Sequence, residues 1–435
     1  MTGPRKVLMV LYAPGALGPV ELMRTLRPVA DLVVAVPEPL RDDPGIRMLS
    51  QLLQPVFYDP DGPGPDMSGV DGVVTYSDSL VRTAADLAVR HGLPGQSPQT
   101  AVALTDKFVQ RTTLAEHGVD AVRCAVLRHP GDWERAVAAV GLPAVVKPTV
   151  GSASRNTFPV TDAAAGEALV RELLTPGQGG APERELILEE MLIGTDQGDH
   201  GDYCSVESIV ADGKAVHLPL SKLRLVPPFR EPGQFCPSHL DSAARAEVTD
   251  LADRALKALD FRWGVTHTEI KLTPRGPRII EVNGRMGGYT NEVIFHAGGS
   301  SLVVHAACLA LGENPPFTPP SEDRLAFQFS HLAPPTSTRL VGVEGTDRVK
   351  KLPGVLNHRL LLAPGRPMRP GVSTQELDML NAVADDHDAM YSLLERVHDL
   401  LRFTVRLREE DGVEREATLS AWELPSAVAL RGERV

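Results

Sequence analysis

The segment His267–Gly288, HTEIKLTPRGPRIIEVNGRMGG, decides how this chain is interpreted. It holds two short strand-like runs, Thr266–Leu272 and Arg278–Val282, joined by a turn rich in proline and glycine. Side chains alternate between the two faces of a strand, and this alternation places Glu269 with the polar residues of the first run. The segment therefore predicts a β-hairpin with Glu269 on one strand and Glu281 on its neighbour.

Oxygen atoms that converge from two adjacent strands would suit a hard cation. Asn283 lies two residues beyond Glu281 and shares its face. Two carboxylates and an amide oxygen are ligands of the kind that Mg²⁺ prefers. Arg285 follows directly and could hold a phosphate that the metal also binds. The alternative is a hairpin whose charged face is only solvated, so the hairpin alone leaves the metal site undecided.

Bulk composition limits the classes of function. The chain has 435 residues, which is room for several domains. Its 43% hydrophobic and 23% charged residues are typical of a globular protein that buries a core. The net charge of −12 gives no basic surface for nucleic acid or an anionic membrane. An anionic ligand must therefore be met by local cations or by metal.

Two further features point to the cytoplasm. The four cysteines show no C-x-x-C spacing, which argues against a zinc site or a disulfide framework and fits a reducing compartment. Residues 7–13 are apolar, but the run is far shorter than the ~20 residues of a membrane span. Pro14 and Gly15 interrupt it at once. We therefore expect a first strand rather than a signal peptide, and no membrane partner.

The order of predicted elements suggests four parts. Residues 1–97 alternate strands (6–14, 31–36, 71–76) with helices (19–26, 79–91), which predicts a parallel Rossmann-like sheet without a dinucleotide fingerprint. Strands and helices continue through residues 98–193 and 194–312. A proline-rich linker at 315–321 marks the boundary at the start of the last part, 313–435, for which we expect strands and one helix over about 373–401.

Phosphate-binding groups are suggested between residues 107 and 155. Lys107 stands near the start of a predicted helix, and Lys147 ends a strand. The loop that follows Lys147 contains Ser152 and Ser154, whose hydroxyl groups, together with backbone N–H groups, could surround phosphate oxygens. No G-x-x-x-x-G-K-[ST] pattern occurs. Solvated lysines and an exposed turn are the alternative reading of each piece alone.

A short acidic strand could receive a purine. Glu189 and Glu190 are adjacent and point to opposite sides of this strand, and Met191 and Leu192 follow as apolar walls. Main-chain groups of such a connecting strand can bind the edge of a base. An edge strand whose acidic residues deter aggregation is the simpler reading of the motif in isolation.

The succession of these motifs resembles the ATP-grasp superfamily, in its carboxylate–amine ligase branch, and within it the L-amino acid ligases. The resemblance covers about residues 100–300. It is carried by six stretches, TDKFVQR (105–111), VVKPTVGSASR (145–155), LILEEMLIG (186–194), DYCSVESIV (202–210), HTEIKL (267–272) and EVNGRMGG (281–288). The implied fold class is α/β and α+β, an ATP-grasp fold with an N-terminal Rossmann-like domain and a C-terminal lobe.

The resemblance also implies roles for individual residues. ATP and Mg²⁺ would be the cofactors, with two Mg²⁺ ions, or Mn²⁺ as the alternative, held by Glu269, Glu281 and Asn283. Arg285, Glu281 and Asn283 would form the catalytic group. The nucleotide would be bound by Lys107, Lys147, Ser152, Ser154, Glu189, Glu190, Met191, Leu192 and Asp202, with Asp202 at the ribose.

Several departures from the family pattern leave alternatives open. Ala153 and Asn156 stand where glycines are common, and an insertion before Asp202 makes Asp196 the rival for the ribose. Glu207, Lys222 and His267 could contact substrate or deprotonate an amine, although lone residues of these types are more often structural.

The implied reaction is formation of an amide from an amino acid or similar carboxylate and an amine, both small molecules, through an acyl phosphate. A biotin-carboxylase-like enzyme and a non-catalytic nucleotide-binding scaffold are the alternatives. A homodimer is the default expectation for the assembly.

Overall fold

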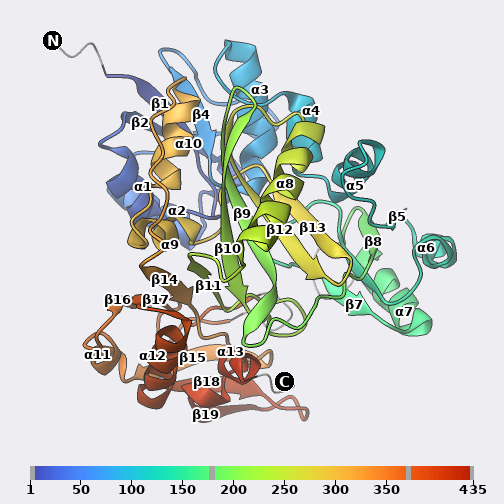
Figure 1. Ribbon diagram of the computed structural model, residues 1–435, viewed down its shortest axis with the longest axis vertical. Helices are drawn as coiled ribbons and strands as arrows, with labels where there is room; N and C mark the ends of the chain where they lie inside the picture. The colour runs from blue at the N-terminus through green and yellow to red at the C-terminus, as the bar shows by residue number, and fades with distance from the viewer. Residues whose placement is uncertain (1–4, 176–181, 369–373, 432–435) are drawn as a thin grey trace.

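The computed structural model describes residues 5–175, 182–368 and 374–431, which form four β-sheets with helices between and around them (Figure 1). The N-terminal sheet lies at one end of the molecule and the C-terminal strands at the other, and the small sheet projects to one side. Within this described part, no helix is both long enough and apolar enough to cross a bilayer. The four cysteines are free thiols.

The N-terminal sheet is fully parallel, in the order β3-β2-β1-β4. Its strands are β1 (Val7–Leu11), β2 (Asp31–Pro37), β3 (Val56–Tyr58) and β4 (Gly72–Thr75), and its helices are α1 (Pro19–Leu26), α2 (Pro44–Leu52) and α3 (Val81–His91). The predicted strands and helices are confirmed, and β3 and α2 are additions. Leu8–Leu11 are buried because helices cover both faces of the sheet.

The small sheet pairs its strands antiparallel in the order β5-β8-β6-β7. These strands are β5 (Cys124–Leu127), β6 (Ala144–Pro148), β7 (Phe158–Val160) and β8 (Leu186–Glu190). Helices α6 (Trp133–Val140) and α7 (Ala163–Leu174) cover one face, where Trp133 and Val146 share a core. The opposite face is left to line a cleft. Helices α4 (Pro98–Ala103) and α5 (Lys107–Glu116) lead into this sheet.

The largest sheet has eight strands in the order β13-β12-β9-β10-β11-β14-β17-β16. Their bounds are β9 (His200–Ala211), β10 (Lys214–Leu223), β11 (Gly233–Cys236), β12 (Gly264–Thr273), β13 (Gly276–Asn283), β14 (Leu325–Phe329), β16 (Val355–Leu360) and β17 (Asp378–Ala384). Strands from before and after residue 313 thus share one sheet. Helix α8 (Ser242–Ala258) packs on β10 and β13, and α10 (Leu302–Ala310) lies between β12 and the N-terminal β4.

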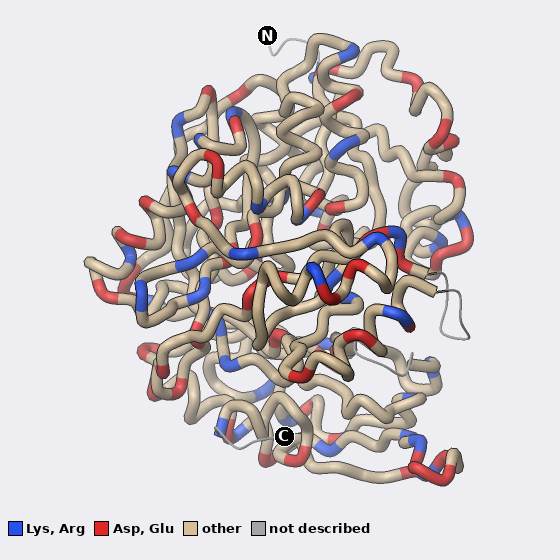
Figure 2. Tube along the Cα trace, turned by 90° about the vertical axis from the view of Figure 1, so that its right-hand side faces the viewer, with Lys and Arg blue, Asp and Glu red and all other residues tan. Residues whose placement is uncertain are grey.

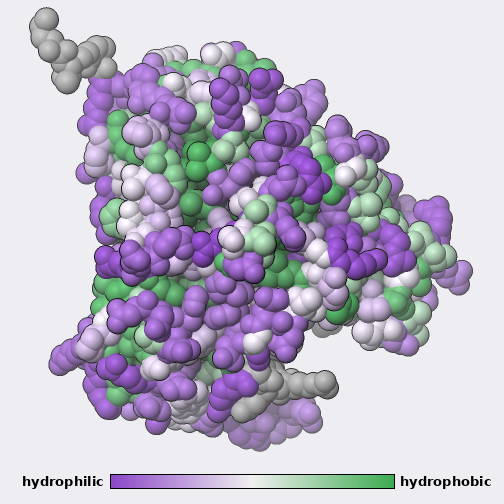
Figure 3. Space-filling view, viewed as in Figure 1, coloured by the Kyte–Doolittle hydropathy of each residue, from purple (hydrophilic) through white to green (hydrophobic). Residues whose placement is uncertain are grey.

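A three-stranded antiparallel sheet closes the C-terminal part. It consists of β15 (Ser337–Glu344), β18 (Arg402–Arg408) and β19 (Glu414–Ser420), with α11 (Thr346–Val349), α12 (His387–Leu400) and α13 (Pro425–Leu430) nearby, and α9 (Thr290–His296) precedes α10. Figure 3 shows the surface indented between this part and the projecting small sheet. Charged residues of both signs are interspersed along the trace in Figure 2.

The single helix expected over about 373–401 is wrong in its first half. Residue 373 lies outside the described residues, and Asp378–Ala384 form β17, which pairs with β14 and β16. Leucine, methionine and alanine in this run favour a helix, but pairing on both sides inside a sheet outweighs that local preference. The helix α12 starts later, where the Asp386 side chain accepts a hydrogen bond from the Ala389 N–H.

Candidate active site

A cleft of about 580 Å³ lies where the small sheet, the β12–β13 hairpin and the strand β14 meet. Its lining extends from the loop after β1 to residues just before β17. All predicted site residues except Asp202 line it, namely Lys107, Lys147, Ser152, Ser154, Glu189, Glu190, Met191, Leu192, Glu269, Glu281, Asn283 and Arg285. The fold therefore gathers in one place groups that are scattered along the sequence.

The predicted hairpin is present as β12 and β13, with strands longer than predicted. Glu269 and Glu281 are direct cross-strand partners, and His267 faces Asn283. The register then shifts: Ile270 pairs with Ile279, and Ile280 is left unpaired as a bulge. This extra residue also lines the cleft. The bulge thus adds an apolar contact beside the two carboxylates.

A buried chain of side chains fixes Glu269. His267 is hydrogen-bonded through Nδ1 to the fully buried Glu207, and its Nε2 lies 3.3 Å from Glu269 Oε1. Burial alone would lower the pKa of His267, but the Glu207 carboxylate raises it to about 9. An imidazole that is protonated at neutral pH is a poor base, so His267 holds Glu269 in place rather than removing a proton from substrate.

Lys107 connects the second hairpin carboxylate to the loop after β6. Its Nζ lies 3.1 Å from Glu281 Oε1 and donates a hydrogen bond of 2.8 Å to the carbonyl oxygen of Gly151. The Lys107 helix α5 begins at Asp106, whose side chain accepts hydrogen bonds from two backbone N–H groups. The cap thus sets where Lys107 stands, between the loop and the hairpin.

Glu189 sits at the centre of a buried ionic cluster. Its carboxylate receives Arg111 Nε at 2.9 Å and Lys147 Nζ at 2.8 Å, and Arg111 also donates to the carbonyl oxygens of Ile279 and Ile280. Burial would raise the pKa of Glu189, but Arg111 and Lys147 hold it at about 2. The Glu189 side chain is thus committed to these two cations, and its predicted contact with adenine stays a prediction.

The loop after β6 adopts an uncommon backbone. Ala153, Ser154 and Asn156 have φ of 54°, 52° and 49°, the left-handed region that favours glycine. These include both positions at which the sequence departs from the glycines of the family pattern. Ser154 Oγ donates to the Phe229 carbonyl oxygen at 3.1 Å, which ties the loop to the other side of the cleft. At the base of this loop, Arg155 forms an ion pair with Glu183.

Asp202, the residue predicted to bind the ribose, lies outside the lining of the cleft. Its Oδ1 accepts a 2.6 Å hydrogen bond from Lys271 Nζ, and Lys271 does line the cleft. Asp196 also lies off the cleft and accepts from the Gly198 N–H. The Asp202 carboxylate packs so closely on Gly194 that a Cβ there would meet Asp202 Oδ2 at 2.1 Å. Asp202 therefore acts on the cleft through Lys271.

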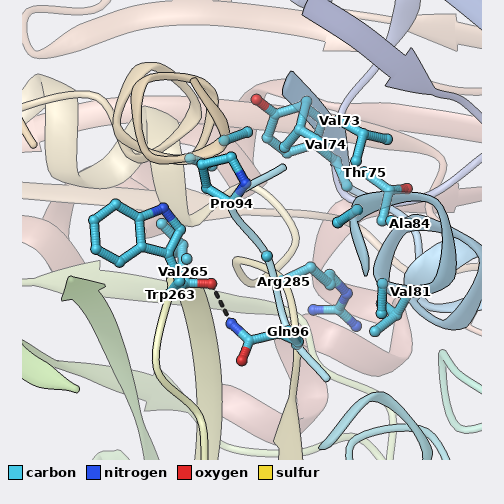
Figure 4. Close-up of a pocket in the computed structure, with 18 of the residues that line it drawn as sticks. Val73, Val74, Thr75, Val81, Ala84, Pro94, Gln96, Trp263, Val265 and Arg285 are labelled. Atoms are coloured by element: carbon cyan, nitrogen blue, oxygen red, sulfur yellow. Dashed lines mark hydrogen bonds between the residues drawn. The ribbon is translucent and has the colours of Figure 1, made fainter. Parts of the chain in front are cut away.

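Arg285 is held by Asp78, which was not among the predicted site residues. Its Nη2 donates to Asp78 Oδ2 at 2.7 Å, and its Nη1 donates to the carbonyl oxygen of Met286. Behind it lies a second cavity of about 80 Å³, walled by Val81, Trp263 and other apolar side chains (Figure 4). Asp78 begins the short helix that follows β4, 207 residues away in the sequence, and no local pattern marks it.

The donor set fits a divalent cation. Two carboxylates directly opposite each other on adjacent strands repel unless a cation lies between them. Glu269, Glu281 and Asn283 all line the cleft and supply hard oxygen ligands. Among the described residues, no group of three or more His, Cys, Asp or Glu side chains could alone hold a metal. Phosphate oxygens of a bound nucleotide would complete the coordination of ions held by this set.

The Glu189 cluster predicts how stability depends on pH. The pKa of Glu189 is about 2 in the folded protein, against an ordinary 4.5. The contribution of Glu189 to the free energy of unfolding is therefore complete above pH 4.5 and is lost as pH falls toward 2. This difference amounts to about 3 kcal/mol of unfolding free energy. In urea denaturation, Glu189→Gln should reduce the decline of the free energy of unfolding between about pH 5 and pH 3. The exposed Glu134→Gln should leave it unchanged; a Glu189→Gln profile as steep as the wild type would refute this account.

Comparison with known proteins finds sequence similarity to two named enzymes. No family model matches it. It is 28% identical over 238 residues to alanine–anticapsin ligase of Bacillus subtilis (strain 168), covering 52% of this chain and 50% of that protein. It is 29% identical over 265 residues to human carnosine synthase 1, covering 57% and 31%. The chain thus spans half or less of the length of these two relatives.

Solved structures match over nearly the whole chain. An L-amino acid ligase from Bacillus licheniformis superposes with a TM-score of 0.71 at 18% identity, covering 92% of this chain and 98% of that one. An N5-carboxyaminoimidazole ribonucleotide synthetase, crystallised with ADP, has a TM-score of 0.66 at 14% identity and covers 91% and 97%. These neighbours share the fold of this chain over about nine tenths of its length.

Proposed function

We propose that the chain is an ATP-dependent, ADP-forming ligase of the ATP-grasp superfamily, since alanine–anticapsin ligase and carnosine synthase 1 are among its relatives and an L-amino acid ligase shares its fold. It would join the carboxylate of an amino acid to an amine through an acyl phosphate. The fold predicted from the sequence is confirmed by the solved neighbours. The observation that carries the proposal is the cross-strand pair Glu269/Glu281, in one cleft with Lys107, Lys147 and Arg285.

The first chemical step transfers the γ-phosphoryl group. A carboxylate oxygen of the substrate attacks the γ-phosphorus, the bond from that phosphorus to the ADP oxygen breaks, and an acyl phosphate and ADP result. Mg²⁺ bound at Glu269, Glu281 and Asn283 would neutralise phosphate charge. Lys107 and Lys147, which line the same cleft, would provide positive charge to the phosphates, and the loop at Ser152 and Ser154 would offer hydroxyl and N–H donors.

The second step forms the amide. The neutral amine attacks the acyl carbon and the C–N bond forms; the nitrogen then loses a proton to solvent, and the C–O bond to phosphate breaks, which releases phosphate. The tetrahedral intermediate carries an oxyanion. Arg285 would stabilise this oxyanion; in support, Asp78 holds its guanidinium and Arg285 lines the cleft. The hydrogen bond from Ser154 to the Phe229 carbonyl oxygen joins two linings of the cleft, and this contact would help to exclude water that would hydrolyse the acyl phosphate.

Phosphate release across pairs of amino acids tests the proposal. With Mg·ATP, we expect one pair to release phosphate well above the rate of ATP alone, with an equal amount of dipeptide detected by mass spectrometry. Omitting either amino acid should remove the amide product. Stable, folded protein that forms no phosphate or amide with any pair would contradict the proposed activity.

A further inference from the structure

One end of the cleft has a polar wall that none of the predicted nucleotide residues forms. Glu376, just before β17, lines it together with Tyr289 at the start of α9 and Gln328 on β14. Tyr289 has a left-handed backbone, with φ of 58°, and its hydroxyl donates to Glu376 Oε2 at 3.2 Å. Three separate segments thus line this end of the cleft, and one of them, through Tyr289, bonds to the Glu376 carboxylate.

Glu376 differs from the other acidic residues of the cleft in its partners. Each of those has a cationic partner: Asp78 with Arg285, Glu189 with Arg111, Glu190 with Arg123, Glu231 with Lys222, Glu269 with His267 and Glu281 with Lys107. Among the described residues, no Lys, Arg or His forms an ion pair with Glu376; its hydrogen-bond partner is the Tyr289 phenol. A carboxylate that faces a cavity without a cation is left for a cation of the ligand.

The electrostatic surroundings agree with that arrangement. Burial raises the pKa of Glu376 to about 7, and the charges of Glu231 and Asp378 add to the rise. The Tyr289 hydrogen bond and the more distant Arg359 act in the opposite direction. A positively charged group bound here would relieve the repulsion from the neighbouring carboxylates and favour the ionised form of Glu376.

We propose that Glu376 binds the ammonium group of the amino acid whose carboxylate is activated. The inference rests on the proposed ligase function and names its acyl donor: a substrate with both a carboxylate and an ammonium group. A carboxylate that stabilises an ammonium ion would suppress attack by a nucleophilic amine, which must be neutral. The ammonium at Glu376 therefore belongs to the donor and not to the acceptor.

The test compares an amino acid with its des-amino analogue, such as alanine with propionate, in the phosphate-release assay. Wild-type protein should prefer the amino acid. Glu376→Gln keeps the shape of the side chain and a partner for Tyr289 but loses the charge, so KM for the amino acid should rise about 10–100-fold while kcat stays within a few-fold. The preference over the des-amino analogue should fall by the same factor. KM for ATP should not change.

A second variant and a control make the result decisive. Tyr289→Phe keeps the carboxylate and should raise KM for the amino acid less than Glu376→Gln does, and the exposed Glu134→Gln should behave as wild type. An unchanged KM for the amino acid with a reduced kcat would overturn the inference. An equal loss of kcat/KM for the amino acid and for its des-amino analogue would do the same, and either result would leave the ligase function standing. If Glu376→Gln fails to fold, equal use of alanine and propionate by wild type overturns it. No turnover in wild type with any donor would instead refute the ligase function itself.

Discussion

Glu281→Ala should reduce ATP-dependent amide formation at least about 100-fold. Glu281 is the cross-strand partner of Glu269 and pairs with Lys107, so the substitution removes a proposed metal ligand and an ion-pair partner together. The substitution should remove several kcal/mol of charge stabilisation from the transition state, and each 1.4 kcal/mol is a factor of ten in rate. Initial rates of phosphate release, at saturating Mg·ATP and amino acids, measure the loss.

The control for this experiment is a hairpin glutamate outside the cleft. Glu416 lies on β19, where it forms an exposed pair with Arg406. Glu416→Ala should retain the rate of the wild type. Circular dichroism and thermal unfolding must show that Glu281→Ala is folded. A folded Glu281→Ala protein with wild-type turnover would show that the hairpin does not form the phosphoryl-transfer centre.

Arg111→Met should lower the free energy of unfolding by about 3 kcal/mol or more. The guanidinium is almost fully buried and donates to Glu189 and to the carbonyl oxygens of Ile279 and Ile280. Removing one member of a buried ionic cluster leaves the other charge poorly compensated, which costs about 3–5 kcal/mol. Lys147 still pairs with Glu189, so the lower end of that range is expected. Urea denaturation at pH 7 gives the value.

Arg171→Met provides the matched control, because Arg171 and Glu167 form an exposed pair on one helix. Such pairs contribute less than about 0.5 kcal/mol. Equal, small losses for both arginine variants would mean that the cluster around Glu189 does not hold the small sheet against the hairpin.

Local patterns were sufficient for much of the fold and for most of the cleft. The β12–β13 hairpin follows from alternation around a turn rich in proline and glycine, and the N-terminal strands follow from short apolar runs. Lys147 is placed at a strand end by the residues immediately around it. Glu269 and Glu281 are brought together by one hairpin, so their juxtaposition needs no long-range information.

The features that were missed depend on contacts between distant segments. Asp78 reaches Arg285 across the boundary between two sheets, and Glu376 enters the cleft only because β17 is inserted between β14 and β16. Residues around β17 have a helical preference, so local patterns predicted neither the strand nor the position of Glu376 just before it. The bulge beside Glu281 is likewise a property of pairing rather than of composition.

The route of the carboxylate oxygen tests the central claim most directly. The donor amino acid is labelled with oxygen-18 in its carboxylate and incubated with Mg·ATP and the acceptor. Attack on the γ-phosphorus predicts that one labelled oxygen appears in the released phosphate for each amide formed, with ADP as the nucleotide product. Amide formation with unlabelled phosphate, or with the label in AMP, would contradict an acyl phosphate formed at the Glu269/Glu281 pair.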